Sequence, residues 1–232
     1  MGKHVVYLVH GLLGTAYAHF GKQIAQWSPR CEVVPIDLPG HGRCRLDAGA
    51  QYLEGAYRYL EAITRRFGPG RLVAASYLGG PLAVRCAAAR PDLVESLVLT
   101  GFAPGLDRGV FLAWLAGFQQ VAERDPALTA QYDRLHTGRW RDTLRAYSDD
   151  AQAAYEQRFR VVPAAISALK QPVLIANGSF KSVEREAAER AADLGPNIRG
   201  VVIEGAGHIA GYDAPEEFDR AVSGFWHEAE EG

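Results

Sequence analysis

The chain has 232 residues, of which 48% are hydrophobic and 22% charged, and its formal net charge at pH 7 is −2. This size and balance predict one compact globular domain with at most one sizeable insertion. The small net charge and the lack of a basic block argue against nucleic acid or a membrane surface as a partner. We therefore expect a small-molecule ligand; the oligomeric state stays open.

The first residues enter an apolar run directly, and no apolar run approaches the roughly 18 residues of a membrane-spanning helix. We expect a cytoplasmic protein. The three cysteines, Cys31, Cys44 and Cys86, show neither C-x-x-C nor zinc-ligand spacing. They predict free thiols, and the sequence carries no motif for a metal or a cofactor.

Six short apolar or β-branched runs alternate with segments of helical length. Runs that are apolar on both faces are typical of a parallel sheet covered on both sides. They lie at 4–9, 32–36, 71–75, 93–99, 172–176 and 199–203.

Three of the intervening segments have clear helical features. Residues 51–67 keep the three- and four-residue apolar spacing of a helix with one buried face. The alanine-rich segment 82–89 predicts a buried helix. Near the C-terminus, Asp213 as N-cap and Pro215 in the first turn predict a helix that runs to about residue 228.

Residues 105–168 contain no convincing strand and are rich in aromatic side chains. Phe111, Trp114 and Phe118 have helical spacing. These features predict a helical cap at 105–168 over the carboxyl ends of the strands, with the core domain at 1–104 and 169–232. The aromatic side chains either pack the cap against the sheet or line an apolar pocket.

Three motifs then occur in a characteristic order: V-Y-L-V-H-G-L-L-G at 6–14, D-L-P-G-H-G-R at 37–43, and E-G-A-G-H at 204–208 followed by A-P-E-E-F at 214–218. In this order the chain resembles the α/β-hydrolase superfamily, in its compact BioH-like and MenH-like branch with a helical cap. The resemblance implies an α/β fold with a mostly parallel six-stranded sheet and helices on both faces. It also implies that the backbone N–H of Leu12 points into an oxyanion hole and that His208 is catalytic.

The stretch A-A-S-Y-L-G-G, residues 74–80, resembles the sharp turn that carries the nucleophile in this family. Small residues are expected two positions before and two after its apex. With Ser76 at the apex, Leu78 breaks this rule. With Tyr77 at the apex, Ala75 and Gly79 obey it. We therefore predict Tyr77 at the apex, Ser76 beside it, and the backbone N–H of Leu78 as the second oxyanion donor.

The segment A-N-G-S-F-K-S-V, residues 176–183, aligns Lys181 with the aspartate of the family. The expected Ser, Asp and His thus become Tyr77, Lys181 and His208. An adjacent lysine would lower the pKa of His208 and keep it neutral, unless Lys181 points into solvent. Glu184 or Glu186, one turn on, is an alternative carboxylate for orienting the histidine.

A phenol beside a histidine favours proton transfer over ester hydrolysis. The leading hypothesis is a lyase that eliminates water or a carboxylate next to a carbonyl, as relatives in natural-product biosynthesis do. The alternatives are an ester or thioester hydrolase, with water activated by His208 and Ser76 recruited, and a non-catalytic binding protein. For a partly apolar carbonyl substrate, the expected binding residues are Lys181, Trp114 and Arg139.

Overall fold

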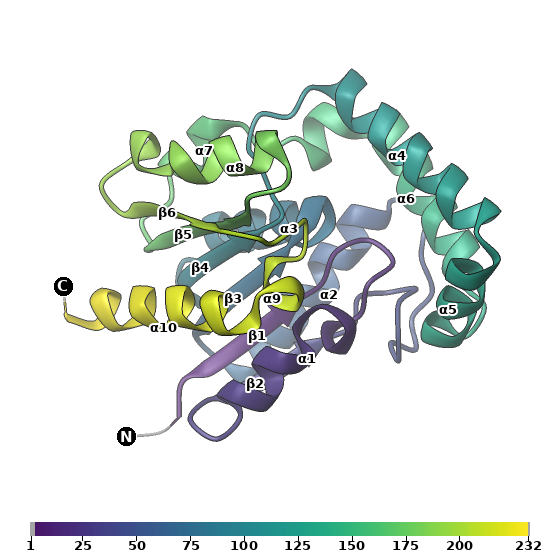
Figure 1. The fold of residues 1–232 in the computed structure, drawn as a ribbon. Helices are drawn as coiled ribbons and strands as arrows, with labels where there is room; N and C mark the ends of the chain where they lie inside the picture. The colour runs from purple at the N-terminus through teal and green to yellow at the C-terminus, as the bar shows by residue number, and fades with distance from the viewer. Residues whose placement is uncertain (1–2, 232) are drawn as a thin grey trace.

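The computed structural model of the protein describes residues 3–231 and is built around a six-stranded sheet (Figure 1). The strand order is β2-β1-β3-β4-β5-β6, and all neighbouring strands are parallel. Each predicted run overlaps one strand, so the predicted six-stranded α/β sheet is confirmed. The strands are β1 (Val5–Val9), β2 (Glu32–Ile36), β3 (Gly70–Ala75), β4 (Val94–Thr100), β5 (Val173–Gly178) and β6 (Ile198–Ile203).

The strand order reverses its direction at β1. From β1 the chain moves outward to β2, and it then returns to the other side of β1 to form β3 and the remaining strands. In open parallel sheets, ligands bind outside the carboxyl ends of the strands at such a reversal. The loops that follow β1 and β3 are therefore the expected walls of a site.

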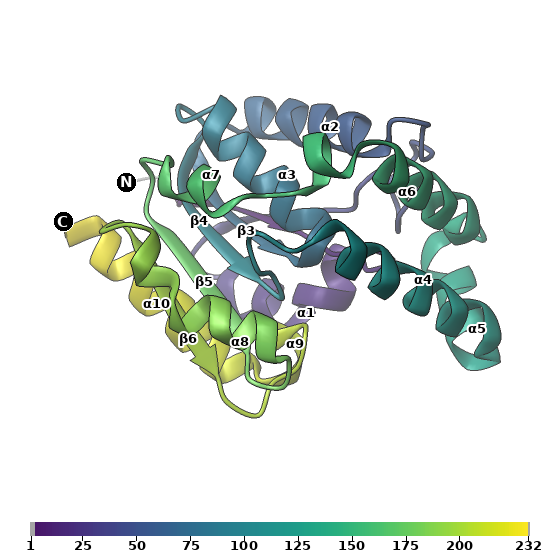
Figure 2. The ribbon, with the colours of Figure 1, turned by 90° about the horizontal axis from the view of Figure 1, so that it is seen from above.

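Helices cover both faces of the sheet, as Figure 2 shows for α2 and α3 on one side and α1 and α10 on the other. Side chains of β1 point alternately to the two faces of the sheet. Tyr7 and Val9 pack into the hydrophobic cluster on one face, and Val6 and Leu8 pack into the cluster on the other. The helices against the sheet are α1 (Ala16–Trp27), α2 (Tyr52–Phe67), α3 (Ser76–Ala89), α8 (Ser182–Glu189) and α10 (Pro215–Glu231), with the short α9 (Ala210–Asp213) and η2 (Ala191–Leu194).

The segment between β4 and β5 is helical throughout its regular structure. Asp107 and Asp125 begin its first two helices by accepting hydrogen bonds from backbone N–H groups of the following turn. The helical elements of this segment are α4 (Arg108–Arg124), α5 (Pro126–His136), α6 (Trp140–Ala154), the π-helical turn η1 (Tyr155–Phe159) and α7 (Pro163–Ser167). Figure 1 shows α4 and α5 reaching past the edge of the sheet.

The last helix, α10, begins at the predicted proline but without the predicted cap. Asp213 ends α9 instead of capping α10, and its Oδ2 accepts a hydrogen bond from the Gly207 N–H at 2.8 Å, so the predicted cap is wrong. Pro215 begins α10 as expected. Within residues 3–231, no helix combines the length and hydropathy needed to cross a membrane.

Candidate active site

The turn from β3 into α3 places Ser76 at its apex. Ser76 has a φ of +63°, a left-handed conformation that non-glycine residues rarely adopt. The backbones around it approach closely: a Cβ added to Gly11 would lie 2.6 Å from Cβ of Ser76. Such a strained, crowded corner is typical of a serine presented at the end of a strand.

The predicted apex at Tyr77 is therefore wrong, and the reason is steric. The Leu78 side chain is fully buried in the core on the α2 and α3 side of the sheet, so a large residue fits two positions after the apex. The close approach occurs one residue later. A Cβ on Gly79 would lie 2.8 Å from the Val9 carbonyl oxygen and 3.0 Å from that of His10.

His208 lies in the loop between β6 and α9 and contacts the first turns of two helices, α3 and α8. Its Nε2 is 2.9 Å from Oγ of Ser76, and its Nδ1 is 2.8 Å from Oε1 of Glu184. A carboxylate only accepts hydrogen bonds, so Nδ1 carries the proton and Nε2 accepts the serine hydroxyl. This is the tautomer that a general base needs.

Glu184 supplies the carboxylate that the sequence comparison assigned to a lysine position. It lies in the first turn of α8 and is fully buried, whereas Glu186 is exposed and pairs with Arg190. Lys181 precedes the helix, with its Nζ 3.9 Å from Oε1 of Glu184 and its side chain half-exposed. Of the two alternative carboxylates predicted from the sequence, Glu184 and Glu186, the structure thus places Glu184 beside His208.

Tyr77 packs its ring into an aromatic cluster. The ring lies parallel to that of His208 with centroids 6.2 Å apart, and it also contacts Phe111 and Trp114. Its buried hydroxyl lies near the Ala103 backbone and the Glu184 carboxylate, but it makes no hydrogen bond of good geometry among the described residues. Burial, and next the Glu184 carboxylate, raise the pKa of this phenol above its ordinary value. The structure therefore does not bring the hydroxyl to a nitrogen of His208.

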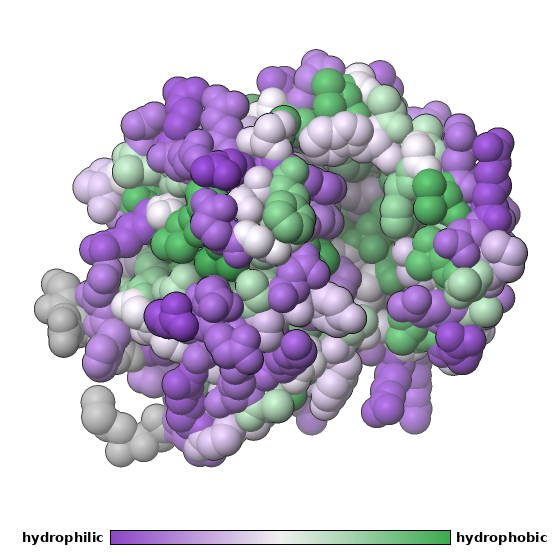
Figure 3. All heavy atoms as spheres, viewed as in Figure 1, coloured by the Kyte–Doolittle hydropathy of each residue, from purple (hydrophilic) through white to green (hydrophobic). Residues whose placement is uncertain are grey.

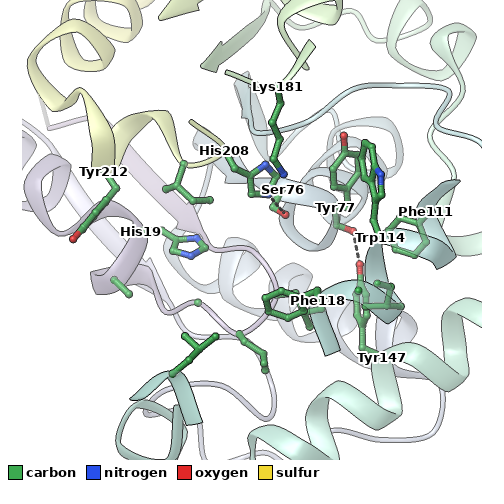
Figure 4. A pocket seen from close by; sticks show the side chains of 18 of the residues that line it. His19, Ser76, Tyr77, Phe111, Trp114, Phe118, Tyr147, Lys181, His208 and Tyr212 are labelled. Atoms are coloured by element: carbon green, nitrogen blue, oxygen red, sulfur yellow. Dashed lines mark hydrogen bonds between the residues drawn. The ribbon is translucent and has the colours of Figure 1, made fainter. Parts of the chain in front are cut away.

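Ser76, Tyr77 and His208 open into a cavity of about 1270 Å³, which Figure 3 shows as a hollow in the surface. Two predicted substrate-binding residues, Lys181 and Trp114, line it, with the lysine Nζ 5.8 Å from the indole ring centroid. In Figure 4 the nucleophile position lies between two groups of side chains. One contains Phe111, Trp114, Phe118 and Tyr147, and the other contains His19 and Tyr212.

Arg139 does not line this cavity, contrary to its predicted role in substrate binding. Its guanidinium bonds to Oδ1 of Asp47 at 3.0 Å and to the Cys44 carbonyl at 2.8 Å. These contacts hold the start of α6 against the loop after β2. The physical reason for the error is that this arginine has local acceptors, which a helix-face argument does not show.

A parallel sheet, a strained serine corner after one strand, a carboxylate from a later helix and a histidine from a later loop define the class of proteins built on a nucleophile elbow. The chain belongs to the alpha/beta hydrolase family, whose model matches residues 6–221. The predicted superfamily is thus confirmed.

Proteins of known sequence or structure that resemble this chain have the same fold. NosK from Streptomyces actuosus, known from its crystal structure, is 55% identical in sequence to this chain; the match covers 99% of this chain and 100% of that chain, with a TM-score of 0.97. The 2-(acetamidomethylene)succinate hydrolase of Mesorhizobium japonicum is 25% identical, covering 93% of this chain and 85% of that protein. MenH from S. aureus, at 20% identity, 99% and 96% coverage and a TM-score of 0.78, shares the fold.

Proposed function

We propose that the protein is a serine-dependent acyl-transfer enzyme that hydrolyses an ester or thioester. The observation that carries this proposal is the pair of hydrogen bonds made by His208, one to the Ser76 hydroxyl and one to the buried Glu184 carboxylate. A serine is a weak nucleophile on its own and is activated by an adjacent base that a third group orients.

The proposed reaction has two halves. Ser76 Oγ attacks the acyl carbon while Nε2 of His208 takes the hydroxyl proton, and Glu184 stabilises the imidazolium formed. The bond to the leaving group breaks, and the alcohol or thiol departs with that proton as the acyl group stays on Ser76. Water then attacks the acyl-enzyme as His208 takes its proton, which returns to Ser76 Oγ when the acid is released.

Main-chain N–H groups can stabilise the negative charge of the tetrahedral intermediate. With Ser76 at the corner, the following N–H is that of Tyr77 and not of Leu78, and it lies in the first turn of α3, where helical N–H groups lack intrahelical partners. The second donor is Leu12, in the loop after β1, as the family resemblance implied.

The cavity favours a substrate with a sizeable aromatic or partly apolar acyl group. Phe111 and Tyr147 are nearly completely buried beside Tyr77, and Trp114 is partly exposed at the same wall. Flat, rigid side chains of this kind bind planar groups through offset or edge-to-face contacts. Participation in natural-product biosynthesis remains a prediction from the resemblance.

Elimination, the leading hypothesis from the sequence, has less support from these contacts. It required a proton relay between the Tyr77 phenol and His208, but both ring nitrogens of the histidine bond to other side chains. Hydrolysis is also the activity in the name of the Mesorhizobium relative. Acyl transfer by Ser76 uses every polar contact of His208 and is the better-supported proposal.

The test is rapid-mixing kinetics with 2-naphthoyl thioesters. We expect a burst of released thiol equal to the enzyme concentration if deacylation is slower than acylation, and an acyl-enzyme detectable by intact mass. Ser76→Ala should abolish the adduct and lower kcat/KM by at least about 10³-fold. Ordinary turnover by Ser76→Ala would refute the proposal, whereas a wild-type protein that binds the aromatic acid without acylation would favour a binding role.

A further inference from the structure

His19, which the sequence analysis did not single out, forms part of the cavity wall beside the nucleophile. It lies in α1, immediately before Phe20, whose φ of −126° and ψ of 18° interrupt the helix. A Cβ on Gly11 would be 3.2 Å from both Cε1 of His19 and Oγ of Ser76. The imidazole and the serine thus flank the same glycine, and Figure 4 shows the ring facing the cavity.

The tautomer of His19 follows from its one hydrogen bond. Its Nδ1 is 3.2 Å from the backbone nitrogen of Gly11, which can only donate, so Nδ1 carries no proton. Burial, reinforced by neighbouring histidines, lowers the pKa of His19 to about 3. The ring is therefore neutral at pH 7, and its proton is on Nε2.

The Nε2–H donor is available to a ligand. Among the hydrogen bonds of the described residues, none uses Nε2 of His19. This nitrogen lies directly over Gly14, where an added Cβ would be 2.3 Å away, and both residues line the cavity. A donor next to a reacting centre, fixed through its other nitrogen, is suited to orienting a substrate.

The position of His19 indicates which half of the substrate it contacts. The aromatic wall, in which Phe111 and Tyr147 are buried, lies on one side of Ser76. His19 lies on the other side with Tyr212, whose side chain is 60% exposed. If the acyl group occupies the aromatic wall, the leaving group extends past His19 towards solvent. This step rests on the proposed acyl-transfer function.

We propose that Nε2–H of His19 forms a leaving-group subsite, which selects alcohol or thiol leaving groups that carry an amide or ester carbonyl near the bond that breaks. The carbonyl oxygen accepts the hydrogen bond from Nε2–H during acylation. After the leaving group departs, the contact no longer exists, so His19 affects acylation and leaves deacylation of the same acyl-enzyme unchanged.

The experiment compares two thioesters of 2-naphthoic acid. One has N-acetylcysteamine as the thiol, which carries an amide carbonyl, and the other has 1-pentanethiol, which has the same chain length and lacks it. For the wild-type enzyme, thiol release in the burst phase should favour the amide thioester by about three- to tenfold, the value of one neutral hydrogen bond. His19→Phe should remove this preference, and His19→Gln should restore part of it.

Two further variants separate a positioning role from a structural one. Gly14→Ala keeps the histidine but displaces its ring, so it should also weaken the preference. His227→Phe, on the exposed surface of α10, is the matched control and should retain it. A distortion of the loop after β1, which carries the Leu12 N–H, would lower the acylation rates of both thioesters equally and would leave their ratio unchanged.

The outcomes are distinct. Loss of the preference in His19→Phe with an unchanged deacylation rate supports the subsite. Equal rates for the two thioesters in the wild type, or a preference that persists in His19→Phe, overturns it while acyl transfer stands. No acylation of wild-type Ser76 by either thioester refutes the proposed function, and with it the subsite.

Discussion

Glu184 is the side chain on which the proposed chemistry depends most closely. It is fully buried, and its Oε1 accepts the hydrogen bond from Nδ1 of His208. Its second oxygen, Oε2, has no hydrogen-bond partner among the described residues. A buried carboxylate with so few hydrogen bonds is costly for stability, which is typical of a group kept for function.

Replacing the carboxylate by an amide tests its role. In Glu184→Gln the neutral amide neither fixes the tautomer of His208 nor stabilises its charged form, so kcat for a thioester should fall about 10²- to 10⁴-fold. Glu186→Gln, on the exposed side of the same helix, is the control and should remain within about twofold. Equal activity in the two variants would mean that Glu184 does not orient the base.

Tyr77→Phe separates acyl transfer from elimination. The phenol hydroxyl lies beside the Glu184 carboxylate and not at either ring nitrogen of His208, and burial raises its pKa. Its loss should therefore lower kcat/KM by less than about tenfold, far less than the loss of Ser76. Steady-state kinetics of the two variants on one substrate make the comparison. A larger loss in Tyr77→Phe than in Ser76→Ala would return the proton-transfer hypothesis to first place.

At the scale of elements, the turn between β3 and α3 requires small residues where α3 passes the end of β1. Gly79 is the residue closest to that strand, since an added Cβ would meet two backbone carbonyl oxygens, which cannot move as a side chain can. The close packing there keeps the serine corner and the loop after β1 together. The corner thus depends on the contact between β1 and α3.

We expect Gly79→Ala to lower the free energy of unfolding by about 1–3 kcal/mol, because the methyl group overlaps the strand. Gly55→Ala in α2 is the matched control: nothing lies within 4 Å of its added Cβ, so alanine should raise the free energy of unfolding by about 0.5–1 kcal/mol. Urea denaturation of both variants measures the difference. Similar stabilities would show that the contact at Gly79 is relaxed without cost.

The sequence predicted the strands and the main motifs correctly, but it did not predict which side chains contact one another across the fold. Period and composition located six parallel strands because the four central ones, β1, β3, β4 and β5, are buried on both faces. The motif order located His208 and the loop after β1. The corner was misassigned because a rule on residue size cannot tell that Leu78 points into the core, and Arg139 was misassigned because its acceptors, Asp47 and Cys44, are distant in sequence.

At the scale of the whole molecule, three buried histidines connect the loops below the site. One ring nitrogen of each accepts a hydrogen bond from a backbone N–H, and the other lies beside a backbone carbonyl oxygen. The N–H groups belong to Leu38 for His10, Leu13 for His41 and Gly42 for His136. The carbonyl oxygens belong to Gly11, Pro39 and Leu13, in the same order. Only a neutral imidazole can do both. Burial lowers the pKa of all three, in the case of His10 to about 4.

These histidines predict acid sensitivity. Their folded-state pKa values are below the unfolded value of about 6.5, so the unfolded chain binds more protons as the pH falls below 6.5, in the case of His10 down to about pH 4. Their contribution to stability is complete above pH 6.5 and is lost as the pH falls, at up to about 1.4 kcal/mol per pH unit for each histidine. Urea denaturation at pH 7 and pH 5 measures this change.

A variant identifies the source of the pH effect. His136→Asn can still accept the Gly42 N–H through its amide oxygen but does not titrate, so its free energy of unfolding should depend less steeply on pH than that of the wild type. Equal wild-type stability at pH 7 and pH 5 would contradict neutral buried histidines.

The most direct test of the central claim is peptide mapping by mass spectrometry after reaction with an aryl fluorophosphonate. The proposed set of Ser76, His208 and Glu184 predicts one phosphonyl adduct on Ser76, formed at a rate that falls steeply in His208→Ala and in Glu184→Gln. Labelling of Tyr77, or no labelling of Ser76 in the wild-type protein, would contradict the account.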